Sequence, residues 1–200
     1  MIAWTIDAAS KSKYVDCVLV STDSESIANI ARRYGAWVPS LRDAHLAKDD
    51  SSVIDVVKNA ISEAESHGKS FEYIALLQPT SPLRNTEHID RAFEKLVRSS
   101  TADDTLVSVK RMDDKLNWVM GRDKESGYLY SLNGLDMTNP RRQELPTCYL
   151  PNGAIYMARS ESFSGFYNTH TLPFIMDGES SIDIDYLEDF ERATDILSKK

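Results

Sequence analysis

The alternation of apolar and polar residues along the chain predicts strands and helices in turn. Short apolar runs rich in β-branched residues, such as DCVLVST (16–22) and YIALL (73–77), are typical of buried strands. Further strands are predicted at 105–110, 153–159 and 172–176, and helices at 2–11, 24–35, 51–66, 86–98 and 186–197. Strands that alternate with helices indicate an α/β fold with a parallel, doubly wound sheet.

Residues 111–150 interrupt this rhythm, because they are polar and rich in turn residues. The stretch GRDKESGYLYSLNG predicts a hairpin with its turn near Lys124–Gly127. The segment also contains more large apolar side chains than a solvated loop needs: Trp118, Met120, Tyr128, Tyr130 and Leu132. We therefore expect one domain over residues 1–200, with 111–150 as an insertion that forms part of a two-fold dimer interface.

The amino-acid composition of the chain argues against several classes of function. The chain has 200 residues, 42% of them hydrophobic, which suits a single globular core. A formal net charge of −8 argues against binding to polymeric nucleic acid, which requires clustered Lys and Arg. The two cysteines show no spacing of a metal site and are expected to be reduced thiols. No apolar run reaches the roughly 20 residues that span a bilayer, and a signal peptide is not evident, so we expect a cytoplasmic protein without a membrane partner.

The glycine pattern shows no phosphate-binding loop. Nucleotide-binding α/β folds often carry a glycine-rich turn after the first strand, but here no two of the eight glycines lie within three residues of each other. Either phosphates are held in another way, or the first strand and its loop are absent. In the second case the sheet lacks its first central strand, and we expect either an apolar groove between 16–22 and 73–77 or a rearranged edge.

Two aspartates stand out in SIDID (181–185). In an extended strand Asp183 and Asp185 project from one face, while Ile182 and Ile184 share the other. Two carboxylates so close favour a divalent cation between them, since hard cations take oxygen ligands. A structural alternative is a capping box, in which Asp185 and Glu188 begin the last helix.

Two polar loops are further candidates for a binding site. LLQPTSPLRN follows a predicted strand, and its two prolines should hold Gln78, Thr80, Ser81 and Arg84 in directions that suit a polyhydroxylated ligand. The alternative is an ordinary connection in which Thr86 caps the next helix. Arg141 and Arg142, followed by Asn152–Gly153, and the loop residue Arg42 are either anion-binding groups or solvated charges.

Taken together, these segments resemble the acylneuraminate cytidylyltransferases, the enzymes that make CMP-sialic acid and related CMP-nonulosonates. The resemblance covers the whole chain and rests on VLVSTDSESIANIARRYGA, LLQPTSPLRN, RRQELP, PNGAIY and SIDID, which occur in the family's order. It implies a Rossmann-like nucleotidyltransferase sheet, CTP and a nonulosonic acid as substrates, a Mg²⁺ requirement and a homodimer. It also implies residue roles: Asp183 and Asp185 for the catalytic metal, Gln78, Arg142 and Tyr156 for the sugar, and Arg42 and Ser52 for the nucleotide. Thr80 and Asn152 are expected beside them in the substrate site.

The chain departs from the family pattern in two places. The family's first strand and its motif of the type I-P-A-R-x-x-S-K are not found, so the sheet is expected to be incomplete at its N-terminal side. Leu150 stands where many members have an arginine before P-N-G. Two alternatives therefore stay open: a non-catalytic remnant of such an enzyme, and a nucleotide-sugar glycosyltransferase with a metal-binding D-x-D.

Overall fold

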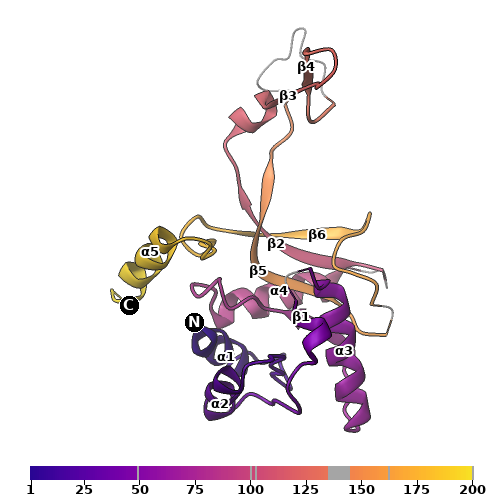
Figure 1. The fold of residues 1–200 in the computed structure, drawn as a ribbon, viewed down its shortest axis with the longest axis vertical. Coiled ribbons are helices and arrows are strands. Elements are labelled where there is room, and N and C mark those ends of the chain that lie inside the picture. Colours follow the sequence, from indigo (N-terminus) through magenta and orange to yellow (C-terminus); the bar gives the residue numbers. More distant parts are fainter. Residues whose placement is uncertain (49, 100, 102, 135–144, 162, 200) are drawn as a thin grey trace.

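A computed structural model describes residues 1–48, 50–99, 101, 103–134, 145–161 and 163–199. The helices are α1 (Ile2–Ser10), α2 (Glu25–Arg33), η1 (Ala44–Leu46), α3 (Val53–Ser66), α4 (Thr86–Arg98), η2 (Asp114–Trp118) and α5 (Leu187–Leu197). The strands are β1 (Tyr73–Leu76), β2 (Thr105–Arg111), β3 (Met120–Arg122), β4 (Leu129–Ser131), β5 (Tyr149–Arg159) and β6 (Thr171–Met176). Figure 1 shows a body of helices and sheet from which one long arm projects.

The main sheet is mixed, with strand order β1-β5-β2-β6. β2 and β6 run parallel, whereas β5 is antiparallel to both of its neighbours, β1 and β2. The prediction of a parallel sheet is therefore wrong, although the α/β class is confirmed. After β2 the chain passes through η2, β3 and β4 and returns as β5, which pairs with β2 in the opposite direction. A strand that returns beside its predecessor in this way is antiparallel to it, whereas parallel strands need a crossover connection.

Both faces of the sheet are covered. Helices α1 and α4 pack on one face in a cluster that includes Ile89, Leu106 and Ile155, each at most 1% exposed. The other face carries Val107 and Ala158, against which α3 and the segment after β5 pack. Among the described residues no helix is both long and apolar enough to cross a membrane.

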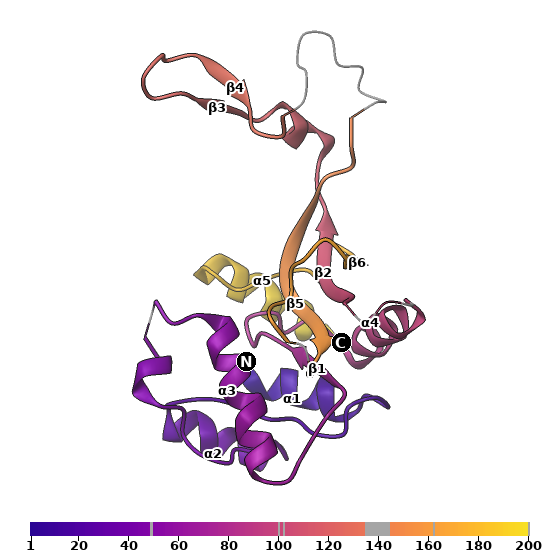
Figure 2. The ribbon, with the colours of Figure 1, turned by 90° about the vertical axis from the view of Figure 1, so that its right-hand side faces the viewer.

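The arm is built from the outer ends of β2 and β5, helix η2 and a hairpin of β3 and β4. The hairpin confirms the predicted turn, since Arg122 pairs with Leu129 and the Asp123 carboxylate accepts hydrogen bonds from the Ser126 N–H (2.7 Å) and hydroxyl. These bonds hold the pKa of Asp123 below its ordinary value. The arm lies far from the body in both views (Figures 1 and 2) and exposes large apolar side chains: Trp118, Val119, Tyr128, Leu129, Tyr130 and Leu132.

The segment 16–22 is not a strand of the sheet. It forms a single parallel bridge, Leu19 to Trp37, and its remaining edge has no ladder partner among the described residues. Between this segment and β1, itself an edge strand, lies a groove of about 790 Å³. Its walls are largely apolar and come from α1, α3, residues 17–21 and residues 73–79. The predicted apolar groove between 16–22 and 73–77 is therefore confirmed.

Candidate functional site

Three residues from distant parts of the chain meet at the middle of the sheet, and we call them the cradle: Gln78, Gly153 and Asp183. Gly153 lies in β5 with φ +73°, a conformation that favours glycine. A Cβ built on it would lie 2.6 Å from Gln78 Oε1 and 2.7 Å from Asp183 Oδ2. The missing side chain thus lets an amide and a carboxylate both approach the strand at the position that a Cβ would occupy.

Asp183 brings an unsatisfied atom to the cradle. Its Oδ1 is buried and has no hydrogen-bond partner among the described residues. The segment 181–185 belongs to no strand, so the prediction of a strand here is wrong; instead the Ile184 N–H donates to the Thr80 carbonyl (2.9 Å). The alternation nevertheless holds, because Ile182 and Ile184 pack together against Leu83. A buried carboxylate oxygen without a donor is a group that a cation would stabilise.

Asp185 is exposed, and its carboxylate makes no hydrogen bond within the described part of the chain. The capping interpretation of this residue is wrong: α5 begins at Leu187, and Asp189 Oδ2 accepts hydrogen bonds from the N–H groups of Tyr186 (3.0 Å) and Asp185 (3.3 Å). The Asp185 carboxylate is therefore available for another partner.

The chemistry of these donors fits a magnesium ion. Asp183 and Asp185 offer carboxylate oxygens and Gln78 an amide oxygen, all hard ligands. No group of three or more Asp, Glu, His or Cys residues gathers within the described ranges, which excludes there a closed all-protein cage. Mg²⁺ is typically held by one or two carboxylates with the rest of its shell taken by water and substrate phosphates. The Asp183 and Asp185 carboxylates would be its ligands from this chain.

Behind the cradle lies a buried polar network centred on Asn152, which is 2% exposed. Its Nδ2 donates to Ser181 Oγ (2.9 Å), and its Oδ1 accepts from Ser108 Oγ (2.6 Å) and from the Ala154 N–H (3.3 Å). Ser108 lies at a bulge of β2 and also accepts the Ile155 N–H (2.7 Å). The Asn152 side chain is thus engaged within the protein, and this geometry favours a positioning role over direct contact with substrate. Sequence patterns gave no signal for Ser108 or Ser181.

Tyr156 follows the cradle on β5 and lies close enough to Asp183 for the two to interact electrostatically. Burial, with smaller contributions from Tyr167 and Asp183, raises the pKa of the Tyr156 hydroxyl to about 12. The phenol is therefore neutral at pH 7 and can donate a hydrogen bond to a sugar oxygen or carboxylate.

The loop after β1 is only partly as expected. The Gln78 side chain forms part of the cradle, and the Thr80 carbonyl accepts a hydrogen bond from the Ile184 N–H. Ser81 and Arg84, predicted to face a ligand, are turned inward and are 0% and 2% exposed. The cap of α4 is Asn85, whose Oδ1 accepts the His88 N–H (2.9 Å), and not Thr86.

The predicted nucleotide residues lie along the apolar groove. Arg42 lines it together with Gln78, so the groove and the cradle share a wall. The Arg42 Nη2 is 3.8 Å from Asp23 Oδ1, while its buried Nε has no hydrogen-bond partner in the part of the chain that the structure describes. Ser52 is exposed at the start of α3, between the groove residues Ser51 and Val53. Arg142 lies outside the described residues.

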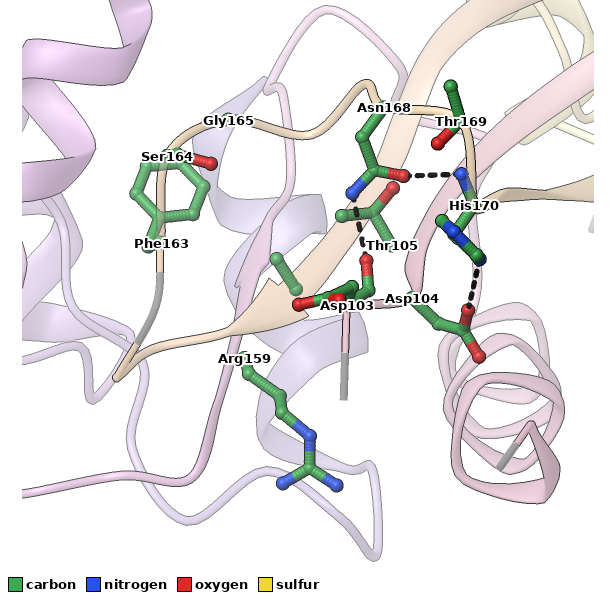
Figure 3. A pocket seen from close by; sticks show the side chains of 11 residues that line it. Asp103, Asp104, Thr105, Arg159, Phe163, Ser164, Gly165, Asn168, Thr169 and His170 are labelled. Atoms are coloured by element: carbon green, nitrogen blue, oxygen red, sulfur yellow. Dashed lines mark hydrogen bonds and ion pairs between the residues drawn. The ribbon is translucent and has the colours of Figure 1, made fainter. Parts of the chain in front are cut away.

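A second cavity, of about 320 Å³, lies near the start of β2 (Figure 3). The Asn168 side chain at this cavity is bonded to the backbone: its Nδ2 donates to the Asp103 carbonyl (2.8 Å), and its Oδ1 accepts the His170 backbone N–H (2.7 Å). Arg159, at its edge, pairs with Glu72 (2.7 Å). This cavity offers no orphaned polar atom among the described residues.

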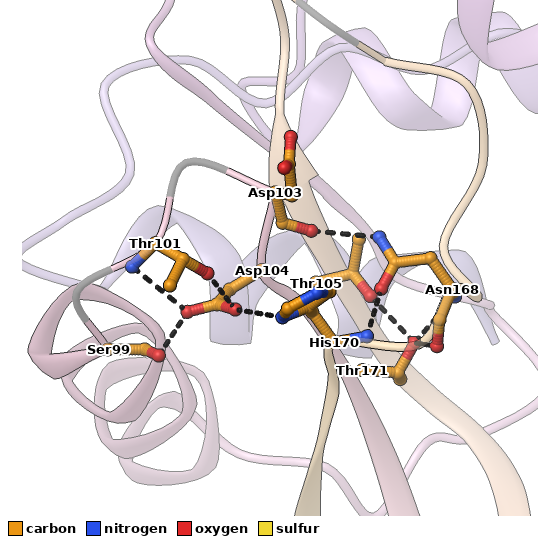
Figure 4. A network of polar contacts seen from close by, with 8 residues as sticks. All are labelled: Ser99, Thr101, Asp103, Asp104, Thr105, Asn168, His170 and Thr171. Atoms are coloured by element: carbon orange, nitrogen blue, oxygen red, sulfur yellow. Dashed lines mark hydrogen bonds and ion pairs between the residues drawn. The ribbon is translucent and has the colours of Figure 1, made fainter.

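The Asp104 network, formed by Ser99, Thr101, Asp104 and His170, adjoins that cavity (Figure 4). The Asp104 carboxylate accepts hydrogen bonds from the hydroxyls of Ser99 and Thr101 and from the Thr101 N–H (3.4 Å), and His170 Nδ1 lies 3.8 Å away. The hydroxyl of Ser99, and then that of Thr101, hold the pKa of Asp104 below its ordinary value. The network joins the end of α4 to the start of β2.

The chain matches a known protein family and several relatives over most of its length. The model of the cytidylyltransferase family matches residues 1–196. The chain is 37% identical to the N-acylneuraminate cytidylyltransferase of Escherichia coli O18:K1:H7 over 203 residues, which is 100% of this chain but only 46% of that protein. It is 36% identical to the CMP-N,N'-diacetyllegionaminic acid synthase of Legionella pneumophila over 189 residues, 92% of this chain and 79% of that one.

A solved structure supports the fold. CMP:2-keto-3-deoxy-manno-octonic acid synthetase, determined in complex with CTP, superposes with a TM-score of 0.67 at 13% identity and covers 99% of this chain and 87% of that one. The expected lack of a first strand and phosphate loop stays a prediction, because the family match runs over residues 1–196. The matches to the family model and to these relatives show that this chain belongs to the cytidylyltransferase family, among relatives of the CMP-nonulosonate synthetases.

Proposed function

We propose that this chain is a CMP-nonulosonate cytidylyltransferase, which transfers CMP from CTP to the anomeric hydroxyl of a nonulosonic acid and releases pyrophosphate. The observation that carries the proposal is the cradle, in which a strand glycine lets Gln78 and the partly orphaned carboxylate of Asp183 converge. The relatives with this activity in their names support the choice of substrate class.

In the proposed reaction the anomeric hydroxyl oxygen attacks the α-phosphorus of CTP. A new phosphorus–oxygen bond forms while the bond to the β-phosphate breaks, so pyrophosphate leaves and the hydroxyl proton is lost to solvent or a base. Positioning and charge stabilisation supply most of the rate in such transfers. Gln78 and the neutral Tyr156 orient the sugar acid, and the groove that contains Arg42 receives the nucleotide.

Mg²⁺ is the proposed cofactor. Bound by Asp183 and Asp185, it would supply positive charge for the triphosphate and lower the pKa of the attacking hydroxyl. Two observations on the described residues support this assignment: the buried Asp183 Oδ1 has no hydrogen-bond partner there, and the Asp185 side chain is exposed.

The direct test is a coupled assay of pyrophosphate release. The protein is incubated with CTP, Mg²⁺ and, separately, neuraminic, legionaminic and pseudaminic acid, and the nucleotide product is identified by mass spectrometry. We expect a CMP-sugar with at least one of the three acids. Formation of none, with a correctly folded sample, would favour the non-catalytic alternative. Transfer of a sugar from a nucleotide-sugar donor would favour the glycosyltransferase alternative.

We also propose that the enzyme works as a two-fold dimer joined through the arm. The support is the row of exposed aromatic and aliphatic side chains on the hairpin, with Tyr128 78% and Leu129 66% exposed. Replacing Tyr128 and Leu129 by Ser should convert the dimer into monomer in light scattering at micromolar concentration. A wild-type protein that is already monomeric there would contradict the proposal.

A further inference from the structure

Arg84 is a buried cation with an unusual set of partners. The residue is 2% exposed, and its Nη1 donates hydrogen bonds to the carbonyls of Gln78 (3.1 Å) and Ala154 (2.9 Å). Among the described residues its buried Nε and Nη2 have no hydrogen-bond partner, and no carboxylate there forms an ion pair with Arg84. Burial lowers the pKa of the guanidinium to about 10, so the group remains charged at pH 7.

Such a group is expensive to bury. A charge removed from water without an opposite charge destabilises the fold, and an apolar side chain of similar length would avoid that cost. The usual reason for a buried arginine, a bidentate ion pair with a carboxylate, does not apply here. The role of the guanidinium therefore has to follow from its two hydrogen-bond acceptors, the carbonyls of Gln78 and Ala154.

Both carbonyls belong to the walls of the cradle. Gln78 supplies the amide oxygen that faces Gly153, and Ala154 follows Gly153 directly in β5. One nitrogen atom thus links the loop after β1 to the strand that carries the glycine, across 76 residues of sequence. In a site of this kind a misplacement of about 1 Å can lower turnover about 10²-fold.

We infer that Arg84 is a positioning residue of the cradle: its guanidinium fixes Gln78 relative to Gly153 and Asp183 without touching substrate. Since Gln78 is the proposed sugar contact, the inference deepens the proposed function and rests on it for its kinetic readout. The nucleotide side of the groove lies beyond Gln78 and should be little affected.

The experiment compares Arg84→Met, Arg84→Lys and a control, Arg91→Met, which removes an exposed arginine on α4 that forms an ion pair with Glu87. Hydrogen–deuterium exchange tests the clamp without any assay of activity. We expect exchange of residues 77–80 and 152–155 to rise about tenfold in Arg84→Met, with the outer strand β6 unchanged, and to stay near wild type in Arg84→Lys and Arg91→Met. Exchange that is unchanged, or raised equally over the whole sheet, would overturn the inference.

Kinetics supply the second readout. In Arg84→Met we expect kcat/KM for the sugar acid to fall about 10²-fold, while KM for CTP stays within about threefold of wild type. Arg84→Lys should recover most of the loss. In a further variant, Arg84→Ala, added guanidinium should restore part of kcat/KM for the sugar acid. A residue that only supports the fold would lower the amount of folded enzyme without separating the two substrates and without rescue. If wild type is inactive the proposed function fails, while the exchange result still decides whether the clamp exists.

Discussion

The cradle and the Asp104 network are both groups of polar side chains at the sheet, but they differ in how they are satisfied. In the Asp104 network each carboxylate oxygen accepts a hydrogen bond from a neighbouring hydroxyl, and no atom is left over among the described residues. In the cradle Asp183 Oδ1 has no hydrogen-bond partner among those residues, and the side-chain oxygens of Gln78 and Asp183 both lie close to Gly153. A satisfied network stabilises the fold, whereas an unsatisfied buried group lowers stability unless a ligand or an ion completes it. The contrast predicts opposite responses to substitution.

The largest effect is expected at Asp185. Asp185→Asn should lower turnover by about 10²–10³-fold, at least as much as the loss of one transition-state donor, because a metal ligand is removed. Stability should hardly change, since Asp189 and not Asp185 caps α5. Pyrophosphate release and thermal unfolding measure the two quantities.

The control for Asp185 is Asp189→Ala, which removes the cap. It should destabilise the protein by roughly 1 kcal/mol and leave turnover per folded molecule near wild type. If Asp185→Asn instead keeps its turnover and its dependence on Mg²⁺, the metal assignment is wrong.

Gly153→Ala should lower turnover about 10²-fold. The new methyl group would lie 2.6 Å from Gln78 Oε1 and 2.7 Å from Asp183 Oδ2, so both side chains must shift to relieve the two contacts. The left-handed backbone adds a loss of about 1–3 kcal/mol in unfolding free energy.

Gly68→Ala is the matched control, because Gly68 has nearly the same φ (+72°) but nothing within 4 Å of its Cβ position. It should lose stability without losing activity. Equal turnover losses in both variants would mean that backbone strain alone matters and that the cradle does not.

The smallest effect on turnover is expected at Asp104. Asp104→Asn should leave activity per folded molecule unchanged but lower the melting temperature, because the Ser99 and Thr101 hydroxyls lose their anionic acceptor. Since the folded pKa of Asp104 lies below its unfolded value, its contribution to stability is present above the ordinary pKa of an aspartate. It is lost as pH falls through the folded value.

Unfolding free energy measured against pH, for wild type and Asp104→Asn, checks this sign. The two curves should converge at acid pH and separate as pH rises. Curves that stay parallel down to the most acid pH would contradict the role given to Asp104.

Much of the fold could be predicted from sequence, because burial patterns report elements well. The predicted helix 86–98 coincides with α4, and the predicted strands at 73–77 and 105–110 lie within one residue of β1 and β2. Strand direction could not be predicted in this way, since periodicity records which side chains are buried and not which strands pair. For the same reason 16–22 has the composition of a strand, but among the described residues its strand-type pairing is limited to the bridge between Leu19 and Trp37.

The candidate site, like the fold, could be predicted only in part from the sequence. Asp183, Gln78 and Tyr156 were expected from their motifs, and the structure brings them together. The inward turn of Arg84 could not be predicted, because its acceptors include the Ala154 carbonyl, far away in sequence. The capping hypothesis for Asp185 failed because spacing alone does not distinguish Glu188 from Asp189 as the residue that reaches back.

The most direct test of the central claim is the rate of pyrophosphate release from CTP by Asp183→Asn, measured per folded molecule over a range of Mg²⁺ concentrations. The unsatisfied carboxylate predicts a fall of about 10²–10³-fold that excess Mg²⁺ does not restore. It also predicts a melting temperature equal to wild type or higher, because an unpartnered buried charge is removed. Turnover near wild type, or unfolding of the variant with its Mg²⁺ dependence intact, would show that Asp183 belongs to the scaffold like Asp104 and would contradict the account.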